Sequence, residues 1–237
     1  MCGIYCEANF CGGYVTTTKI IKGLKSLENR GYDSCGIFLK NKKNHVITKN
    51  MNLDAFNENK EKFNFGMGHT RWCTNGKPCI TNSHPHVSGL EEKIPVYIVH
   101  NGILENISEV KDYITKNIKS FSKVYKTSTD TEVIANYIAA IIRIHDKTDV
   151  LEVIKNIFDN KIETSISGSN TFIINYGERN FIYKSNNSLM IGMSDNGAVK
   201  IASEKYALEK CKTIFLFKNG VYEINDKLFA KIKNYND

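Results

Sequence analysis

The chain has 237 residues, of which 41% are hydrophobic and 24% are charged, so it is long enough for one globular domain or two small ones, and a disordered or fibrous chain is excluded. Lys and Arg number 32 against 25 Asp and Glu, which gives a net charge of +7. The basic residues are scattered lysines without interleaved aromatic side chains, so the charge indicates a solvated surface and no nucleic-acid partner.

In chain order, the first part of the sequence mixes helices and strands. Apolar residues at helical spacing, with Gly31 at the expected C-terminal stop of the first helix, predict helices at Thr16–Arg30, Asn106–Ile118, Asp130–His145 and Asp149–Phe158. The run Thr129–Glu132 predicts a capping box, in which hydroxyl and carboxylate exchange hydrogen bonds with backbone N–H groups. Short β-branched runs predict strands at Ile37–Lys40, Val46–Thr48, Phe65–Thr70 and Val96–His100.

The C-terminal third reads as a series of hairpins. Strands are predicted at Thr171–Tyr176, Phe181–Tyr183, Leu189–Met193, Ala198–Ala202, Ile214–Phe217 and Val221–Ile224. The last two flank Asn219-Gly220, a pair typical of two-residue hairpin turns. Two antiparallel sheets covered by helices would account for this α+β order, although the pattern alone leaves the topology open.

Signals for membranes and disulfides are missing from the sequence. The chain starts without a basic stretch followed by an apolar run, and its longest apolar run, 137–142, is far shorter than the ~20 residues that span a bilayer. Seven cysteines at irregular spacing do not suggest a disulfide framework. We therefore expect a cytoplasmic protein with reduced thiols and no membrane partner.

Three places in the sequence carry possible chemistry. Removal of Met1 would give Cys2 both a thiol and a free α-amine, which titrates near ~7.7–8.0 and could accept the thiol proton. Asn101-Gly102 ends a predicted strand, where a side-chain amide and a backbone N–H could hold an oxyanion, or simply form a turn.

The third place is 68–78, a strand that runs into a loop with Arg71, one of four arginines, and Trp72, the single tryptophan. A guanidinium binds a carboxylate through two parallel hydrogen bonds, and Asp130, in the first turn of a predicted helix, could bind an ammonium group. Together they would suit an amino acid, although a carboxylate at a helix N-terminus is also stabilising by itself.

A structural metal site is the rival interpretation of the cysteines. Its possible ligands are Cys2, Cys6, Cys11, Cys73, Cys79, His84 and His86, but their spacings match no paired C-x2-C zinc motif. We expect neither a metal nor a cofactor.

Six short motifs, in order, carry a family resemblance. They are Cys2-Gly3-Ile4, LENRGYDSCGI (27–37), GHTRWCTNGKP (68–78), TNSHPH (81–86), IVHNGILEN (98–106) and STDTEVI (128–134). Together they resemble the glutaminase domain of the glutamine–fructose-6-phosphate amidotransferases, which are class II glutamine amidotransferases and N-terminal-nucleophile hydrolases. The resemblance implies a four-layer αββα sandwich, and a single glutaminase domain over 1–237 without the sugar-isomerase domains of that family.

The resemblance also implies a role for each matching residue. Cys2 would attack the side-chain amide of L-glutamine and form a γ-glutamyl thioester, with Asn101 and Gly102 as the oxyanion hole. Arg71 and Thr74 would hold the substrate carboxylate, Asp130 the α-amine, and Trp72 would belong to the mobile loop that gates the ammonia path. Arg30–Ser34 would be mainly structural, with an Arg–carboxylate arrangement under the site.

The sequence also departs from the family pattern. Cys73, Thr74 and Asn75 follow Arg71-Trp72 where the family usually has Ala, Thr and His, and Ser203-Glu204 stands where Ser-Asp is common.

The resemblance further implies that the ammonia would pass to fructose 6-phosphate on a sugar-isomerase domain or subunit. The alternatives are a standalone glutaminase for another acceptor and a non-catalytic glutamine-binding module.

Overall fold

The computed structural model describes residues 2–73, 78–89, 94–118, 125–145, 149–159, 161–162, 164–195, 197–209, 211–228 and 230. Their helices are α1 (Thr17–Lys25), α2 (Ile107–Asn117), α3 (Asp130–Ile144) and α4 (Val150–Phe158), with short 3₁₀ turns η1 (Glu28–Arg30), η2 (Leu53–Ala55), η3 (Ile80–Asn82) and η4 (Lys205–Leu208). Their strands are β1 (Gly3–Asn9), β2 (Ser34–Lys40), β3 (His45–Asn50), β4 (Phe65–Arg71), β5 (His86–Val87), β6 (Val96–Gly102), β7 (Asn170–Tyr176), β8 (Arg179–Lys184), β9 (Met190–Ser194), β10 (Ala198–Ala202), β11 (Cys211–Leu216) and β12 (Gly220–Glu223).

The described strands form two sheets. One has seven strands in the order β11-β9-β10-β1-β4-β2-β3, and the other has five in the order β12-β8-β7-β6-β5. The neighbouring strands pair antiparallel in both. The predicted α+β class with two antiparallel sheets is therefore confirmed.

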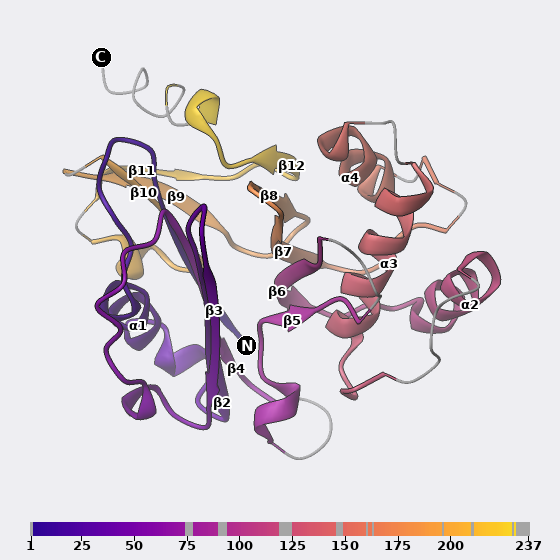
Figure 1. Cartoon of the computed structure of the whole chain (residues 1–237), viewed down its shortest axis with the longest axis horizontal. Coiled ribbons are helices and arrows are strands. Elements are labelled where there is room, and N and C mark those ends of the chain that lie inside the picture. The colour runs from indigo at the N-terminus through magenta and orange to yellow at the C-terminus, as the bar shows by residue number, and fades with distance from the viewer. Residues whose placement is uncertain are drawn as a thin grey trace.

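Three hydrophobic cores separate four layers, which Figure 1 shows from α1 on one flank to α2, α3 and α4 on the other. The first core lies between α1 and the seven-stranded sheet, the second between the two sheets, and the third between the five-stranded sheet and α2–α4. Strand alternation along β1 explains the division, because Ile4, Cys6 and Ala8 belong to the core between the sheets while Tyr5 belongs to the core under α1. This is the αββα sandwich that the resemblance implied.

The helix predictions agree with the structure apart from their ends. Thr129 caps α3 and accepts a hydrogen bond from the backbone N of Glu132 at 3.4 Å, as predicted. The Glu132 carboxylate accepts from the N–H groups of Lys126 at 2.8 Å and Thr127 at 2.7 Å. The second half of the capping box is thus directed at the preceding loop and ties that loop to the start of α3.

Two strands were absent from the sequence prediction, and one hairpin was wrong. β1 and β5 were not predicted. β11 pairs with β9 in one sheet and β12 with β8 in the other, so Asn219-Gly220 carries the chain between sheets. The Asn219 side-chain oxygen accepts from Lys184 Nζ at 2.9 Å and from Asn186 N at 3.1 Å. Asn219 therefore bonds to residues distant in sequence, and Phe217 and Ile224 are buried between the sheets. These interactions outweigh the local preference of Asn-Gly for a two-residue hairpin turn.

The topology places several chain segments at one edge of the sandwich. β1 and β4 are antiparallel neighbours with Gly3 opposite Thr70, so the start of β1 lies beside the end of β4. A Cβ atom on Gly3 would lie 2.6 Å from Thr70 Oγ1 and 2.8 Å from Leu27 Cβ, so only glycine allows this close packing after Cys2. Over the described residues, no helix combines the length and apolar character needed to cross a membrane.

Candidate active site

Cys2 directly precedes β1 and is held by three separate segments. Its Sγ lies 3.3 Å from the backbone N of Trp72, which donates to it. Its carbonyl oxygen accepts from Arg30 Nε at 2.8 Å and from Asn101 Nδ2 at 3.0 Å. The chain start is therefore fixed between the end of the first helical segment, the end of β4 and the end of β6.

Burial raises the pKa of the Cys2 thiol above its ordinary value of 9.0. The hydrogen bond from Trp72 and the positive charges of Arg71 and Arg30 act in the opposite direction without overcoming burial. At neutral pH the thiol is therefore protonated and needs a base before it can act as a nucleophile. A free α-amine on the same residue has a pKa near ~8 and could serve as that base.

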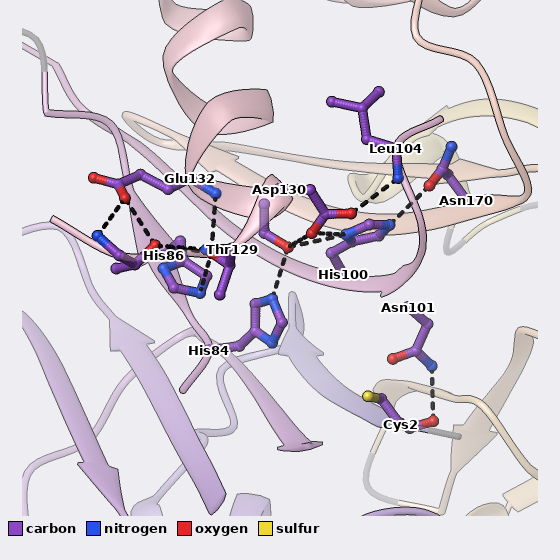
Figure 2. A network of polar contacts seen from close by, with 12 residues as sticks. Cys2, His84, His86, His100, Asn101, Leu104, Thr129, Asp130, Glu132 and Asn170 are labelled. Carbon is purple, nitrogen blue, oxygen red and sulfur yellow. Dashed lines mark hydrogen bonds and ion pairs between the residues drawn. The ribbon is translucent and has the colours of Figure 1, made fainter. Parts of the chain in front are cut away.

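Asn101 and Gly102 end β6, as predicted, opposite Thr171 and Asn170 of β7. Gly102 has φ +146°, a conformation that side chains rarely permit. Asn101 Nδ2 donates to the Cys2 carbonyl oxygen and to Ser203 Oγ at 3.1 Å, and Figure 2 shows the side chain directed at Cys2. To bind a developing oxyanion, this amide would exchange one of these two partners.

Ser203 and Glu204 complete the support of Cys2, and sequence reasoning recorded them only as a departure from the family. Ser203 Oγ accepts from the backbone N of Ile4 at 2.9 Å, and its own N–H donates to the Ile4 carbonyl at 3.0 Å. Glu204 forms an ion pair with Arg30. Arg30 thus pairs with a carboxylate from outside the motif Arg30–Ser34, in which the Arg–carboxylate arrangement was expected.

Arg71 is the last residue of β4 and is 92% buried, with 8% of its surface exposed. Within the described part of the chain, its Nη1 has no hydrogen-bond partner. A buried guanidinium N–H without a partner costs free energy, so an anionic ligand would satisfy it. This observation fits the predicted carboxylate-binding role.

Trp72 follows Arg71 and is 40% exposed, with its ring edge-on to Tyr32 at a centroid distance of 5.2 Å. The loop is tied down after Trp72, because the Cys73 N–H donates to Asp33 Oδ2 at 2.6 Å. The predicted substrate ligand Thr74 and the unusual Asn75 lie outside the described residues.

Asp130 begins α3 and lies against the segment that follows β6. Its Oδ2 accepts from the backbone N of Leu104 at 2.9 Å, and its Oδ1 lies 3.8 Å from His100 Nδ1. The Thr131 hydroxyl also lies 3.3 Å from Oδ1, and Figure 2 shows the carboxylate beside Leu104 and His100. The Asp130 side chain is 25% exposed, so its carboxylate remains partly open to a ligand.

Four buried histidines lie behind these residues, at positions 69, 84, 86 and 100. Sequence reasoning considered only His84 and His86, and only as rival metal ligands. Within the described residues no group of three or more His, Cys, Asp or Glu side chains could hold a metal ion, and all seven cysteines are free. His69, His84 and His100 are hydrogen-bonded to one another and to Thr131 instead, and His86 Nε2 is hydrogen-bonded to Thr129 Oγ1 at 3.1 Å.

No protein-family model matches the chain. Among curated proteins, it is similar to glutamine–fructose-6-phosphate aminotransferase (isomerizing) of Streptococcus agalactiae serotype III, with 33% identity over 242 aligned positions that cover 98% of this chain and 36% of that protein. The enzyme of the same name from Helicobacter pylori is 31% identical and covers 99% of this chain and 38% of its own length. The chain thus spans little more than a third of these relatives.

Among solved structures, the glutamine phosphoribosylpyrophosphate amidotransferase of B. subtilis, complexed with ADP and GMP, matches with a TM-score of 0.71 at 22% identity, over 95% of this chain and 47% of that one. A glutamine aminotransferase class-II domain protein from Silicibacter pomeroyi matches with a TM-score of 0.53 at 10% identity, over 94% of this chain and 98% of that one. At these identities the likeness concerns the fold, which is the same two-sheet sandwich.

Proposed function

The chain belongs to the class II glutamine amidotransferases, and from this we propose that it hydrolyses L-glutamine to glutamate and ammonia through a thioester on Cys2. We further propose that residues 1–237 make up one glutaminase domain. The seven free cysteines support a reducing compartment, the cytoplasm.

One observation carries the proposal: the structure brings the main chain of Cys2 against Asn101 at 3.0 Å, across 99 positions of sequence. Attack of the Cys2 thiolate on an amide carbon would create an oxyanion, so efficient catalysis needs hydrogen-bond donors beside Cys2. The end of β6 supplies the amide of Asn101 and the backbone of Gly102 at that place. Arg71, whose Nη1 has no partner among the described residues, lies at the end of β4, the strand that pairs with β1.

The reaction follows from these positions. After Met1 removal, the α-amine of Cys2 takes the thiol proton, and the thiolate attacks the side-chain amide carbon of glutamine. The carbonyl oxygen becomes an oxyanion, stabilised by Asn101 and Gly102. The protonated α-amine then gives its proton to the leaving nitrogen, and ammonia departs. Water attacks the γ-glutamyl thioester with the amine again as base, which releases glutamate and restores the thiol.

Substrate selection would rest on two charges at the other end of glutamine. Arg71, with Thr74, would bind the α-carboxylate, and Asp130 would bind the α-ammonium. Loss of either partner would leave a charge unpaired, at a cost of order 2–5 kcal/mol if the contact is buried. Trp72, exposed beside the site, would close the loop over the bound substrate.

The acceptor is a further part of the proposal. The relatives named glutamine–fructose-6-phosphate aminotransferase suggest that the ammonia goes to fructose 6-phosphate on a sugar-isomerase domain or subunit. This chain matches only 36% of one such protein's length. A different acceptor would leave the proposed glutaminase chemistry unchanged.

The experiment is a glutaminase assay on three proteins of verified mass: Met1-free chain, Met1-retaining chain and Met1-free Cys2→Ala. We expect glutamate and ammonia in equal amounts from the first only. Turnover by the Met1-retaining chain would contradict the role of the α-amine, and turnover by Cys2→Ala would contradict the thioester. Glutamine binding without turnover in the Met1-free chain would identify a binding module.

A further inference from the structure

Behind the site, three histidines and Thr131 form one continuous hydrogen-bonded chain. The contacts are His69 Nε2 to the His100 carbonyl oxygen at 2.9 Å, His69 Nδ1 to His84 Nδ1 at 3.1 Å, His84 Nε2 to Thr131 Oγ1 at 2.9 Å, Thr131 Oγ1 to His100 Nδ1 at 2.9 Å, and His100 Nε2 to Asn170 Oδ1 at 2.9 Å. All five residues are buried, so no bulk water competes for these contacts. Figure 2 shows His84, His100, Asp130 and Asn170 in this arrangement.

Both ends of the chain are oxygen atoms that only accept hydrogen bonds. One end is the backbone carbonyl of His100. The other is the side-chain oxygen of Asn170, whose orientation is fixed because its Nδ2 donates to the Ser167 carbonyl at 3.1 Å. Turning the amide over would place its oxygen against the Ser167 carbonyl oxygen, so Asn170 presents an acceptor to His100.

The hydrogens in this chain can be counted. Five contacts need five hydrogens, one in each. A neutral imidazole has one N–H, so His69, His84 and His100 supply three, and the Thr131 hydroxyl supplies a fourth at most, because it also lies 3.3 Å from Asp130 Oδ1 and can donate there. At least one contact is therefore unsatisfied if every histidine is neutral. An additional proton on one imidazole completes all five when the hydroxyl hydrogen is directed at a histidine.

The charges around the chain select His100 for that proton. Burial and the positive charge of Arg71 lower the pKa of His69 to about 3, and burial with neighbouring His69, His86 and Arg71 lowers the pKa of His84. Burial also lowers the pKa of His100, but there the Asp130 carboxylate acts in the opposite direction, with Oδ1 3.8 Å from Nδ1. His100 also lies against the uncharged ring of Phe172, at 4.4 Å between centroids and an interplanar angle of 35°.

We propose that, when no ammonium group is bound at Asp130, this hydrogen-bonded network holds one extra proton at His100 as the partner of the Asp130 carboxylate. Binding of an α-ammonium group at Asp130 then displaces that proton. The inference rests on the proposed function for the identity of the ligand, L-glutamine. His100 and Thr131 are then positioning residues: they orient Asp130 and keep its charge balanced until substrate arrives. Glutamine binding releases a proton as a result.

Thr131→Val gives a sharp test because it removes the hydroxyl from the hydrogen-bonded network while the side chain keeps its shape. Without the hydroxyl, His69 and His84 have two contacts and two hydrogens, and His100 has one of each. Neutral histidines then satisfy every contact, so the requirement for an extra proton disappears. Asp130 loses the longer contact to the Thr131 hydroxyl, at 3.3 Å, and keeps its contact to the Leu104 N–H at 2.9 Å.

The first measurement is histidine ¹⁵N NMR on the ligand-free Cys2→Ala protein. Six histidines make the spectrum assignable by substitution. Since burial lowers the pKa of His100, we expect two protonated ring nitrogens on His100 at a pH below 6.5, and one in Thr131→Val at the same pH. A single protonated nitrogen on His100 in the parent at every pH down to the acid limit of the folded state would overturn the proposal, whatever the protein binds.

The second measurement is calorimetry of L-glutamine binding in buffers of different ionisation enthalpy, again with Cys2→Ala. We expect proton release on glutamine binding at a pH below 6.5, up to about one proton per glutamine, falling as pH rises, and little release from Thr131→Val. Equal release from both proteins would overturn the proposal. A parent with the His100 signature that fails to bind glutamine would contradict the proposed function alone.

Discussion

Gly102→Ala tests whether the end of β6 is placed for catalysis. Gly102 has φ +146°, so an alanine there costs about 1–3 kcal/mol in backbone strain. The new Cβ would lie 2.4 Å from the Ser169 carbonyl oxygen and 2.7 Å from both Asn170 Oδ1 and His100 Nε2. Ordinary contact begins near 3.4 Å, so the end of β6 must move by ~1 Å.

A displacement of this size at a reacting centre costs ~10²-fold in rate, and loss of one oxyanion donor ~10²–10³-fold. We therefore expect glutamate production by Gly102→Ala to fall ~10²–10³-fold. The thermal midpoint should fall by about 2–4 °C per kcal/mol of strain. Gly89→Ala is the matched control, because among the described residues its Cβ meets nothing closer than Asn136 Oδ1, at 3.9 Å, and activity should not change.

The result that would refute this reasoning is full activity of Gly102→Ala in a protein whose melting temperature has fallen. Strain would then be present at Gly102 without any effect on the reaction, and the oxyanion site would lie elsewhere. Should the variant fail to fold, Asn101→Asp asks the same question. It keeps the shape of the side chain but replaces the donor amide that faces Cys2 with an acceptor, and should also abolish turnover.

Other residues give further predictions. Arg71→Lys should raise the KM for glutamine at least tenfold, because an ammonium cannot make the two parallel contacts of a guanidinium; an unchanged KM in steady-state kinetics would contradict its carboxylate role. Thr129→Ala should lower the free energy of unfolding by about 0.5–2 kcal/mol in urea titrations through loss of the α3 cap, with the exposed Thr115→Ala as control. Burial raises the pKa of Glu7 above 4.5, so the folded state loses stability as pH rises through that pKa. Glu7→Gln should therefore melt at a higher temperature than the parent at pH 7 and lose this advantage below pH 4.5, and an equal advantage at all pH values would show that ionisation is not the cause.

Much of the architecture was predictable because periodicity reports burial on one face. The helices were found from apolar spacing, and strands such as Phe65–Thr70 from β-branched and aromatic runs. β1 was missed because it lies in the middle of its sheet with both faces covered, and Glu7 and Gly3 interrupt its apolar pattern. The β11–β12 hairpin was wrong because Asn219-Gly220 has the local signal of a tight turn, while burial of Phe217 and Ile224 between the sheets decides the path.

Part of the site was equally predictable. Cys2, Asn101, Gly102, Arg71 and Asp130 were found from residue chemistry and motif resemblance. Their supporting contacts were not, since the Ser203–Ile4 and Glu204–Arg30 pairs join positions more than 170 residues apart. The histidine chain was missed because a hydrogen-bonded network leaves no periodic pattern; the one available signal was that His69, His84, His86 and His100 all fall within the quoted motifs.

The central claim is that Cys2 becomes covalently acylated by glutamine, and mass spectrometry of the peptide that begins with Cys2 tests it most directly. The Met1-free protein is mixed with glutamine, quenched in acid within the first turnovers and digested. We predict a γ-glutamyl adduct on the peptide that begins with Cys2, absent from the Met1-retaining chain. Steady glutamate production with no adduct on Cys2, or with the adduct on another residue, would contradict the account.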